Sequence, residues 1–344
     1  MRERALITGY PGWLTGHLLR QLDDLTRAPE PPAWAEALSD VSWRALVAPE
    51  TSPHPDGQVD DIVVDDIVVG DIRDPQAVAT AMQDVTIVLH AAGIIHPRRV
   101  QELYAVNRDG CECLATAAVK AGVRRFVFVS SNAAAGFAEP GRPMRETDEA
   151  RPTSHYGRSK LEGEQALWRS LDGSATEGVV LRPTTFYGPH FPARHLKAYR
   201  LAGSGRPLVI GDGRNLVSMI YIDDLVDALG RAMTMPTAAG GTAFVADSQS
   251  YEWQEIFIAM GQAQNVRVQP LHLPRQVANL CAWGDGLLSA LGRYSMMVHV
   301  AGEATQHMAC ETAVAGSLLG VTPQVGLYEG MRRAVSWARG EGWL

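Results

Sequence analysis

The chain has 344 residues, of which 46% are hydrophobic and 20% are charged, and its formal net charge is −7. Both fractions are close to the average of globular proteins, which excludes a disordered chain, and the negative charge argues against a nucleic-acid-binding surface. A length above that of one average domain predicts a main domain with a smaller lobe.

Neither a membrane span nor a metal site is expected. No apolar run reaches the roughly 18 residues that a span requires. The first strand-like run, Arg4 to Thr8, begins within a few residues of Met1, so no signal peptide is expected and the predicted location is the cytoplasm. The four cysteines, at positions 111, 113, 281 and 310, lack the spacing of a metal site and are expected to be reduced structural thiols.

Short apolar runs alternate with helical segments in the first half of the chain. The expected strands are Ala5–Thr8, Trp43–Val47, Ile62–Val69, Thr86–His90, Arg125–Ser130 and Gly178–Arg182. The expected helices are Gly16–Thr26, Pro75–Met82, Val106–Ala121 and Tyr156–Ser170. This alternation predicts an α/β fold with a doubly wound parallel sheet and right-handed crossovers.

The alternation fades after Arg182, where several Pro and Gly residues follow. Two further helices are expected, at Tyr251–Ala259 and Tyr328–Ala338. We therefore expect a smaller mixed α/β C-terminal substrate lobe, formed by residues 183–216 and 248–344. Residues 1–182 and 217–247 are expected to form a dinucleotide-binding domain.

A glycine-rich turn directly follows the first strand and opens a helix. Its glycines allow a tight turn and a close approach of the backbone to a pyrophosphate, whose charge then sits at the helix N-terminus. This context predicts a Rossmann sheet that binds a dinucleotide. The turn residues expected to bind it are Gly9, Tyr10, Pro11, Gly12, Trp13 and Leu14.

Tyr156 and Lys160 are four positions apart, so on a helix they share one face. The chain has only three lysines, which makes an accidental Tyr–Lys pair at this offset rare. A nearby ammonium favours the phenolate form of a tyrosine, whose ordinary pKa is about 10. We expect Lys160 and an oxidised nicotinamide to lower the pKa of Tyr156 towards about 7, which requires about 4 kcal/mol.

Together these motifs resemble the extended short-chain dehydrogenase/reductase family, in its NAD-dependent epimerase/dehydratase and 3β-hydroxysteroid dehydrogenase-like branch. The resemblance covers nearly the whole chain in the family's order, and it implies an NAD(P)-dependent oxidoreductase. Besides the glycine turn and the Tyr–Lys pair, the matching segments are Gly70–Asp74, His90–Gly93, Phe126–Ser131, Leu181–Thr184, Tyr187–Pro189 and Tyr221–Asp224.

The resemblance implies a catalytic set of Ser131, Tyr156 and Lys160. Ser131 lies 25 residues before Tyr156 (156 − 131), which fits the family, and Ser130 is the alternative. Tyr156 would donate a proton to the substrate oxygen, Ser131 would hydrogen-bond the same oxygen, and Lys160 would hold the nicotinamide ribose. The other implied cofactor-binding residues are Ala48, Asp71, Ile72, His90, Ala91, Ala92, Gly93, Asn107, Ser130, Arg182, Pro183 and Thr184.

The cofactor is expected to be NAD or NADP, with NAD favoured. The second strand ends in Val47-Ala48-Pro49, with neither an acid for a ribose hydroxyl nor an arginine for a 2′-phosphate. Basic residues are also absent at Tyr10 and Pro11. Thr15 occupies the place of the family's third glycine.

The substrate is expected to be a small, largely apolar molecule. Nucleotide-sugar members of the family usually offer an Asn and an Arg to a diphosphate, at positions that are Thr185 and Val217 here, so a diphosphate would lose two partners. The mostly apolar segment Val277–Val300 fits an apolar pocket. The residues expected to line the pocket are Ile94, His96, Asn132, Ala133, Thr185 and Tyr187.

These observations favour a ketoreductase or hydroxy dehydrogenase with a Ser-Tyr-Lys site. A nucleotide-sugar epimerase or dehydratase is the alternative, and a non-catalytic regulator that binds a dinucleotide is a third hypothesis. In the resembled family, helices equivalent to Val106–Ala121 and Tyr156–Ser170 often form a dimer interface, which implies a homodimer.

Overall fold

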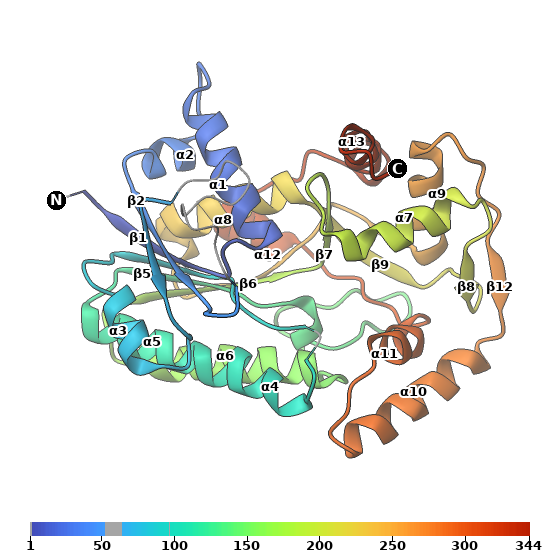
Figure 1. The fold of residues 1–344 in the computed structure, drawn as a ribbon, viewed down its shortest axis with the longest axis horizontal. Helices are drawn as coiled ribbons and strands as arrows, with labels where there is room; N and C mark the ends of the chain where they lie inside the picture. The colour runs from blue at the N-terminus through green and yellow to red at the C-terminus, as the bar shows by residue number, and fades with distance from the viewer. Residues whose placement is uncertain (1, 52–63, 96) are drawn as a thin grey trace.

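The apolar runs of the first half, together with β6 and β10 further along the chain, form a seven-stranded parallel sheet in the order β10-β6-β5-β4-β1-β2-β3 (Figure 1). The computed structural model describes residues 2–51, 64–95 and 97–344. The strands are β1 (Arg4–Thr8), β2 (Ser42–Val47), β3 (Asp66–Val69), β4 (Ile87–His90), β5 (Arg125–Val129), β6 (Glu177–Pro183) and β10 (Thr242–Val245). The predicted parallel Rossmann-type sheet is confirmed. The start of the expected strand Ile62–Val69 lies outside the described residues.

Helices cover both faces of this sheet, which explains why its central strands are apolar throughout (Figure 1). One face packs against α1 (Trp13–Thr26), α2 (Ala33–Leu38), α8 (Ile222–Thr234) and α12 (Ala313–Leu319). The other packs against α3 (Pro75–Ala81), α5 (Gly110–Ala121) and α6 (His155–Leu171). The expected helix Val106–Ala121 begins earlier, as α4 (Val100–Tyr104) followed by one π-helical turn, Ala105–Asp109, that runs into α5.

The remaining strands form two small sheets beside the large one. The first has the order β11-β9-β7, and the second pairs β12 with β8. Their strands are β7 (Thr185–Tyr187), β8 (Leu208–Ile210), β9 (Leu216–Tyr221), β11 (Ser250–Glu252) and β12 (Leu271–Leu273). The helices around them are α7 (Leu196–Gly203), α9 (Trp253–Ala263), α10 (Gln276–Ala290), α11 (Met296–Glu303) and α13 (Leu327–Gly340). Short 3₁₀ turns occupy Asn132–Ala134, Ala193–His195 and Pro236–Ala238.

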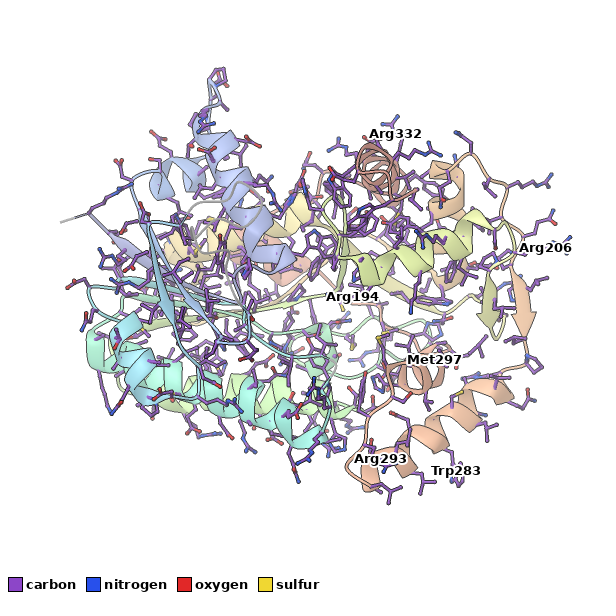
Figure 2. The ribbon with its side chains drawn as sticks, in the orientation of Figure 1. Arg194, Arg206, Trp283, Arg293, Met297 and Arg332 are labelled. Atoms are coloured by element: carbon purple, nitrogen blue, oxygen red, sulfur yellow. The ribbon has the colours of Figure 1, made fainter. Side chains whose placement is uncertain are left out.

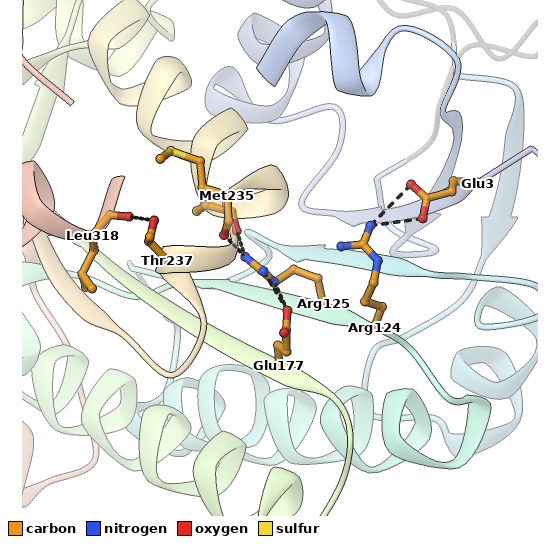
Figure 3. A network of polar contacts seen from close by, with 8 residues as sticks. Glu3, Arg124, Arg125, Glu177, Met235, Thr237 and Leu318 are labelled. Atoms are coloured by element: carbon orange, nitrogen blue, oxygen red, sulfur yellow. Dashed lines mark hydrogen bonds and ion pairs between the residues drawn. The ribbon is translucent and has the colours of Figure 1, made fainter. Parts of the chain in front are cut away.

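An arginine ties the amino ends of the strands to α8 (Figure 3). The Arg125 guanidinium is buried and pairs with the Glu177 carboxylate at 2.7 Å. It also donates to the carbonyl oxygens of Ala232 and Met235, at 2.7 and 3.0 Å. These carbonyls belong to the last turn of α8, where no intrahelical donor is available. The opposite, carboxyl edge of the sheet is therefore left for a site.

Candidate active site

The turn between β1 and α1 requires its two glycines. Gly9 has a φ of +83°, and a Cβ atom there would lie 2.8 Å from the backbone of Ala91 and Ala92. A Cβ atom on Gly12 would lie 2.5 Å from the carbonyl oxygen of Gly9. Gly12 precedes α1, and no described side chain caps that helix, so its first N–H groups can bind an anion. The turn therefore fits a pyrophosphate.

Side chains around this turn hold it in place. The buried Thr15, at the position of the third family glycine, donates its hydroxyl proton towards the carbonyl oxygens of Gly9 and Gly12, at 3.0 and 3.1 Å. The indole of Trp13 donates to the carbonyl oxygen of Pro189 at 2.8 Å, which joins α1 to the segment after β7. Tyr10 and Leu14 are buried.

His90, at the end of β4, is enclosed by the protein. Its Nδ1 lies 2.8 Å from the hydroxyl of Thr8, and its ring stacks on Phe128 with centroids 5.1 Å apart. Burial lowers the pKa of His90 to about 3, with a smaller effect of the Lys160 charge in the same direction. The imidazole is therefore neutral, and its role in the structure is to pack the loop that follows.

In that loop Gly93 packs closely against Asn107 and Lys160. A Cβ atom on Gly93 would lie 3.1 Å from both the Oδ1 of Asn107 and the Nζ of Lys160. Asn107, in the π-helical turn, donates to the Ile94 carbonyl and to the Ser159 hydroxyl, both at 3.0 Å, and accepts from the Ile94 N–H at 2.9 Å. Asn107 thereby fastens the β4 loop to α6, and its placement in a π-helical turn could not be predicted from the sequence.

Ser131, Tyr156 and Lys160 meet at the carboxyl end of β5. The hydroxyl of Ser154 accepts a hydrogen bond from the N–H of Gly157, so α6 begins just before Tyr156. Tyr156 lies close enough to Ser131 for that side chain to act on its pKa. One helical turn on, the buried ammonium of Lys160 donates to the Val129 carbonyl at 2.9 Å and lies over the ring of Phe128.

Burial sets the protonation of this group. It raises the pKa of Tyr156 to about 12, although the Ser131 side chain acts in the opposite direction. It lowers the pKa of Lys160 to about 8, although the charges of Cys111 and Glu164 act against it. Among the protein's own groups, desolvation of the phenolate is the largest effect on the Tyr156 pKa. At neutral pH Tyr156 is therefore a phenol that can donate a proton. The lowering expected from Lys160 together with an oxidised nicotinamide stays a prediction.

Ser130, the alternative to Ser131, is engaged elsewhere. Its hydroxyl donates to Glu164, whose carboxylate also accepts from the Nε and a terminal nitrogen of Arg182, at 3.0 and 2.6 Å. Ser130, Glu164 and Arg182 are all buried. The structure thus places Arg182 in an internal ion pair. Sequence reasoning missed Glu164, although its spacing of four from Lys160 puts it on the same helix face.

The residues expected at the adenosine end lie at the carboxyl ends of β2 and β3. Ala48 is half-buried, and Ile72 is buried against Gly110 of α5. The Asp71 carboxylate pairs with Arg73, whose hydrogen bonds lower the pKa of Asp71. The Glu50 charge also acts on Arg73, whose pKa is raised chiefly by Asp71. Arg73 and Glu50 were not among the predicted site residues.

The expected pocket residues divide into two groups. Asn132 and Ala133 follow Ser131 directly and are half-buried, as is Ile94. Thr185 is exposed, whereas Tyr187 is buried and its hydroxyl donates to Asp247 at 3.2 Å. Pro183 and Thr184 are buried at the end of β6. His96 lies outside the described residues.

The α10–α11 hairpin comes close to this site. His155, next to Tyr156, has its Nδ1 2.8 Å from the hydroxyl of Tyr104. Burial and Arg158 lower the pKa of His155, while the carboxylate of Asp285 in α10 raises it.

No helix among the described residues is long and apolar enough to cross a membrane.

Comparison with known proteins agrees with this geometry. Residues 5–246 match the model of the NAD dependent epimerase/dehydratase family. The uncharacterized protein y4nL of Sinorhizobium fredii is 35% identical over 97% of this chain and 94% of its own. The ceramide reductase of Caulobacter vibrioides is 28% identical over 100% of this chain and 96% of its own. The UDP-glucose 4-epimerase of Vibrio cholerae is 33% identical over 54% of this chain and 60% of its own.

A solved structure shows the same fold. DesIV, a dTDP-glucose 4,6-dehydratase from Streptomyces venezuelae with NAD bound, superimposes with a TM-score of 0.75 at 22% identity. The match covers 99% of this chain and 98% of that one.

Proposed function

Because the chain belongs to the NAD dependent epimerase/dehydratase family, we propose that it is a dehydrogenase or ketoreductase. Its substrate would be a ketone or secondary alcohol of a largely apolar molecule. The observation that carries the proposal is that Tyr156 lies beside Ser131 and one helical turn from the buried ammonium of Lys160. This arrangement suits proton donation to one substrate oxygen.

Each residue has a distinct part in the proposed reduction. A nicotinamide cofactor, when bound, supplies the hydride. Tyr156 donates its proton to the carbonyl oxygen as negative charge develops there, and Ser131 hydrogen-bonds the same oxygen. The Lys160 ammonium has three N–H donors, and one of them bonds the Val129 carbonyl oxygen. Among the described residues the other two have no acceptor, so they can bond ribose hydroxyls. In the oxidation direction Tyr156 must first lose its proton, which its raised pKa disfavours.

Charge distribution favours an apolar substrate over a nucleotide sugar. Val217 is buried in the core of the small lobe, so it offers no charge to a diphosphate. Nearby arginines could substitute for the missing one, but Arg194 and Arg214 are exposed, and Arg200 donates to the carbonyl oxygen of Trp343 (Figure 2 labels Arg194). A buried diphosphate without cationic partners costs several kcal/mol.

The relatives bear on the same choice. The ceramide reductase aligns along the whole chain, including the small lobe, which supports a lipid-like substrate. The UDP-glucose 4-epimerase aligns over about half of it, which keeps a nucleotide-sugar epimerase or dehydratase as the alternative. Turnover of apolar ketones, compared with a panel of nucleotide sugars, distinguishes the two. No turnover of either would leave the regulator hypothesis.

Four further predictions accompany the proposal. NAD is favoured over NADP, since the Glu50 carboxylate lies near Arg73 and Asp71 already pairs with that arginine. Residues 1–182 with 217–247 would bind the dinucleotide, and 183–216 with 248–344 the substrate. The chain would act in the cytoplasm, and as a homodimer through α5 and α6.

We predict that Tyr156→Phe removes most turnover, because only the transferable proton is lost. General acid catalysis contributes about 10²–10⁴-fold, which sets the expected fall in kcat. Steady-state kinetics with an apolar ketone measures it, and calorimetry should give an unchanged Kd for the cofactor. Tyr328→Phe, at an exposed tyrosine of α13, is the matched control. A Tyr156→Phe enzyme with more than about a tenth of the wild-type kcat contradicts the assignment.

A further inference from the structure

The α10–α11 hairpin turns an apolar face to the outside. Leu280, Trp283, Leu287 and Leu291 recur every three or four residues, so they share one face of α10, and each is more than half exposed. On α11 Met297 is 81% exposed. Figure 2 shows Trp283 on the side of α10 that faces away from α11, Met297 at α11 and Arg293 near the end of α10. A contiguous apolar patch of this kind marks a surface that another apolar phase covers.

The acidic groups of the hairpin lie beneath this face. Asp285 is the only charged residue of α10, and its carboxylate is 2.9 Å from the Nδ1 of His299. The Nε2 of His299 is 3.5 Å from Glu303. All three side chains are mostly buried, with at most 28% exposed. The outward face of the described hairpin therefore carries no carboxylate.

Two arginines flank the apolar face. Arg275 precedes α10 and Arg293 lies in the turn between α10 and α11, and both are exposed. Neither forms an ion pair within the part of the chain that the structure describes. The rim is thus positive on a chain whose net charge is −7. This local charge selects an anionic surface.

We propose that the face of α10 formed by Leu280, Trp283, Leu287 and Leu291 docks on an anionic lipid bilayer. An apolar helix face with tryptophan and flanking arginines lies in the membrane interface, its apolar side chains among the acyl chains and its arginines at phosphates. α10 has 15 residues, fewer than the roughly 20 that a membrane-spanning helix needs, so it would lie along the membrane surface.

The charge of the rim disfavours a second copy of the chain as the occupant. A two-fold interface would bring the same arginine-flanked patch against itself, with no outward carboxylate of the hairpin to pair with Arg275 or Arg293. The carboxylate of Asp285 in the hairpin also acts to raise the pKa of His155, the residue before Tyr156. Docking would bring the site close to membrane lipids. The idea that docking serves access to a lipid-like substrate rests on the proposed function, whereas the docking itself does not.

The test is co-sedimentation of the full chain with vesicles, without cofactor or substrate. One set of vesicles is phosphatidylcholine and the other is phosphatidylcholine mixed with phosphatidylglycerol. We expect binding to the anionic set, and at least about a tenfold loss of partitioning for Leu280→Ser/Trp283→Ser/Leu287→Ser, because three large apolar side chains leave the interface. Val69→Ser/Leu201→Ser/Tyr328→Ser changes three exposed apolar residues on other elements and should bind as wild type.

The arginines are tested in the same assay. Arg275→Glu/Arg293→Glu should weaken binding to the anionic vesicles, whereas Arg194→Glu/Arg206→Glu, at two exposed arginines elsewhere, should not (Figure 2). Circular dichroism and cofactor binding report whether each variant folds.

Two results would overturn the proposal. The first is that the apolar triple variant binds the anionic vesicles as strongly as the wild type does. The second is a wild-type dimer, seen by sedimentation without lipid, that the same variant dissociates while vesicles bind neither protein. Because the assay contains no substrate, its outcome is separate from that of the turnover test, which can fail alone.

Discussion

At the scale of single residues, Glu164 holds together two buried side chains behind the candidate site. Its carboxylate receives hydrogen bonds from Ser130 and Arg182, and all three groups are buried. We predict that Glu164→Ala lowers the free energy of unfolding by about 3–5 kcal/mol, because it leaves the Arg182 charge buried and unpaired. Urea denaturation measures the change.

The matched control for this substitution is Glu149→Ala. Glu149 pairs with Arg151 on the surface, where both side chains are mostly exposed, so the denaturation midpoint should not move. Equal midpoints for Glu164→Ala and wild type would show that Arg182 finds another partner.

Asp247 makes stability depend on pH. Its carboxyl accepts from the hydroxyls of Tyr187 and Tyr251 and from the N–H of Tyr221. Burial nevertheless raises the pKa of Asp247 from 3.8 to about 7. Since the folded pKa exceeds the unfolded one, the contribution of the protonated carboxyl is complete below pH 3.8 and is lost as the pH rises through about 7.

We predict that Asp247→Asn removes this dependence. The unfolding free energy of wild type minus that of the variant should fall between about pH 4 and pH 7, by roughly 4 kcal/mol at most. Thermal or urea denaturation across that range measures it, with Asp84→Asn at an exposed aspartate as the control. Parallel pH profiles of the wild type and Asp247→Asn would contradict the raised pKa.

At the scale of elements, the Arg125 contacts join β5 and β6 to the end of α8. We predict that Arg125→Met lowers the free energy of unfolding by about 2–4 kcal/mol, because the carbonyls of Ala232 and Met235 lose their donor. The Kd for the cofactor should not change, since these contacts lie at the amino edge of the sheet.

The neighbouring arginine is the control. Arg124→Met makes the same chemical change, but Arg124 pairs with a half-exposed Glu3, so the expected loss is within about 1 kcal/mol. A similar loss in both variants would mean that the α8 contact contributes nothing.

The sequence predicts best those elements whose side chains are buried on every side. The central strands are buried on both faces, so their apolar runs identify them, with ends at most one residue off. The π-helical turn Ala105–Asp109 and the strand β10 could not be predicted. The first leaves no mark on helical periodicity, and the second is a four-residue run whose partner, β6, lies far away in sequence.

The same distinction holds for the candidate site. Tyr156 and Lys160 could be placed together because they are four residues apart on one helix, and the resemblance supplied Ser131. The Glu164–Arg182 pair needs a contact between α6 and β6, and the pKa of Tyr156 depends on burial that no local pattern reveals.

At the scale of the whole molecule, stability is unevenly distributed. α8 buries eight residues against the sheet and its neighbours, whereas α10 buries only Ala278. We predict that amide hydrogens of Gln276–Ala290 exchange much faster than those of Ile222–Thr234, because opening α10 exposes little apolar surface. Hydrogen–deuterium exchange by mass spectrometry measures both peptides. Equal protection in the free protein would mean that something already covers α10.

The late position of β10 in the sequence also delays completion of the large sheet while the ribosome makes the chain. The chain leaves the large sheet at Pro183 and returns to it, beside β6, only with β10, which begins at Thr242 and is complete at Val245. At about 5–20 residues per second, the 62 residues after Pro183 through Val245 (245 − 183) take roughly 3–12 s to make. For that interval the nascent sheet has an open β6 edge, with the apolar Val179 and Leu181 beside it. This edge is where a growing chain would be most exposed to pairing with another, and where a chaperone would be of most use.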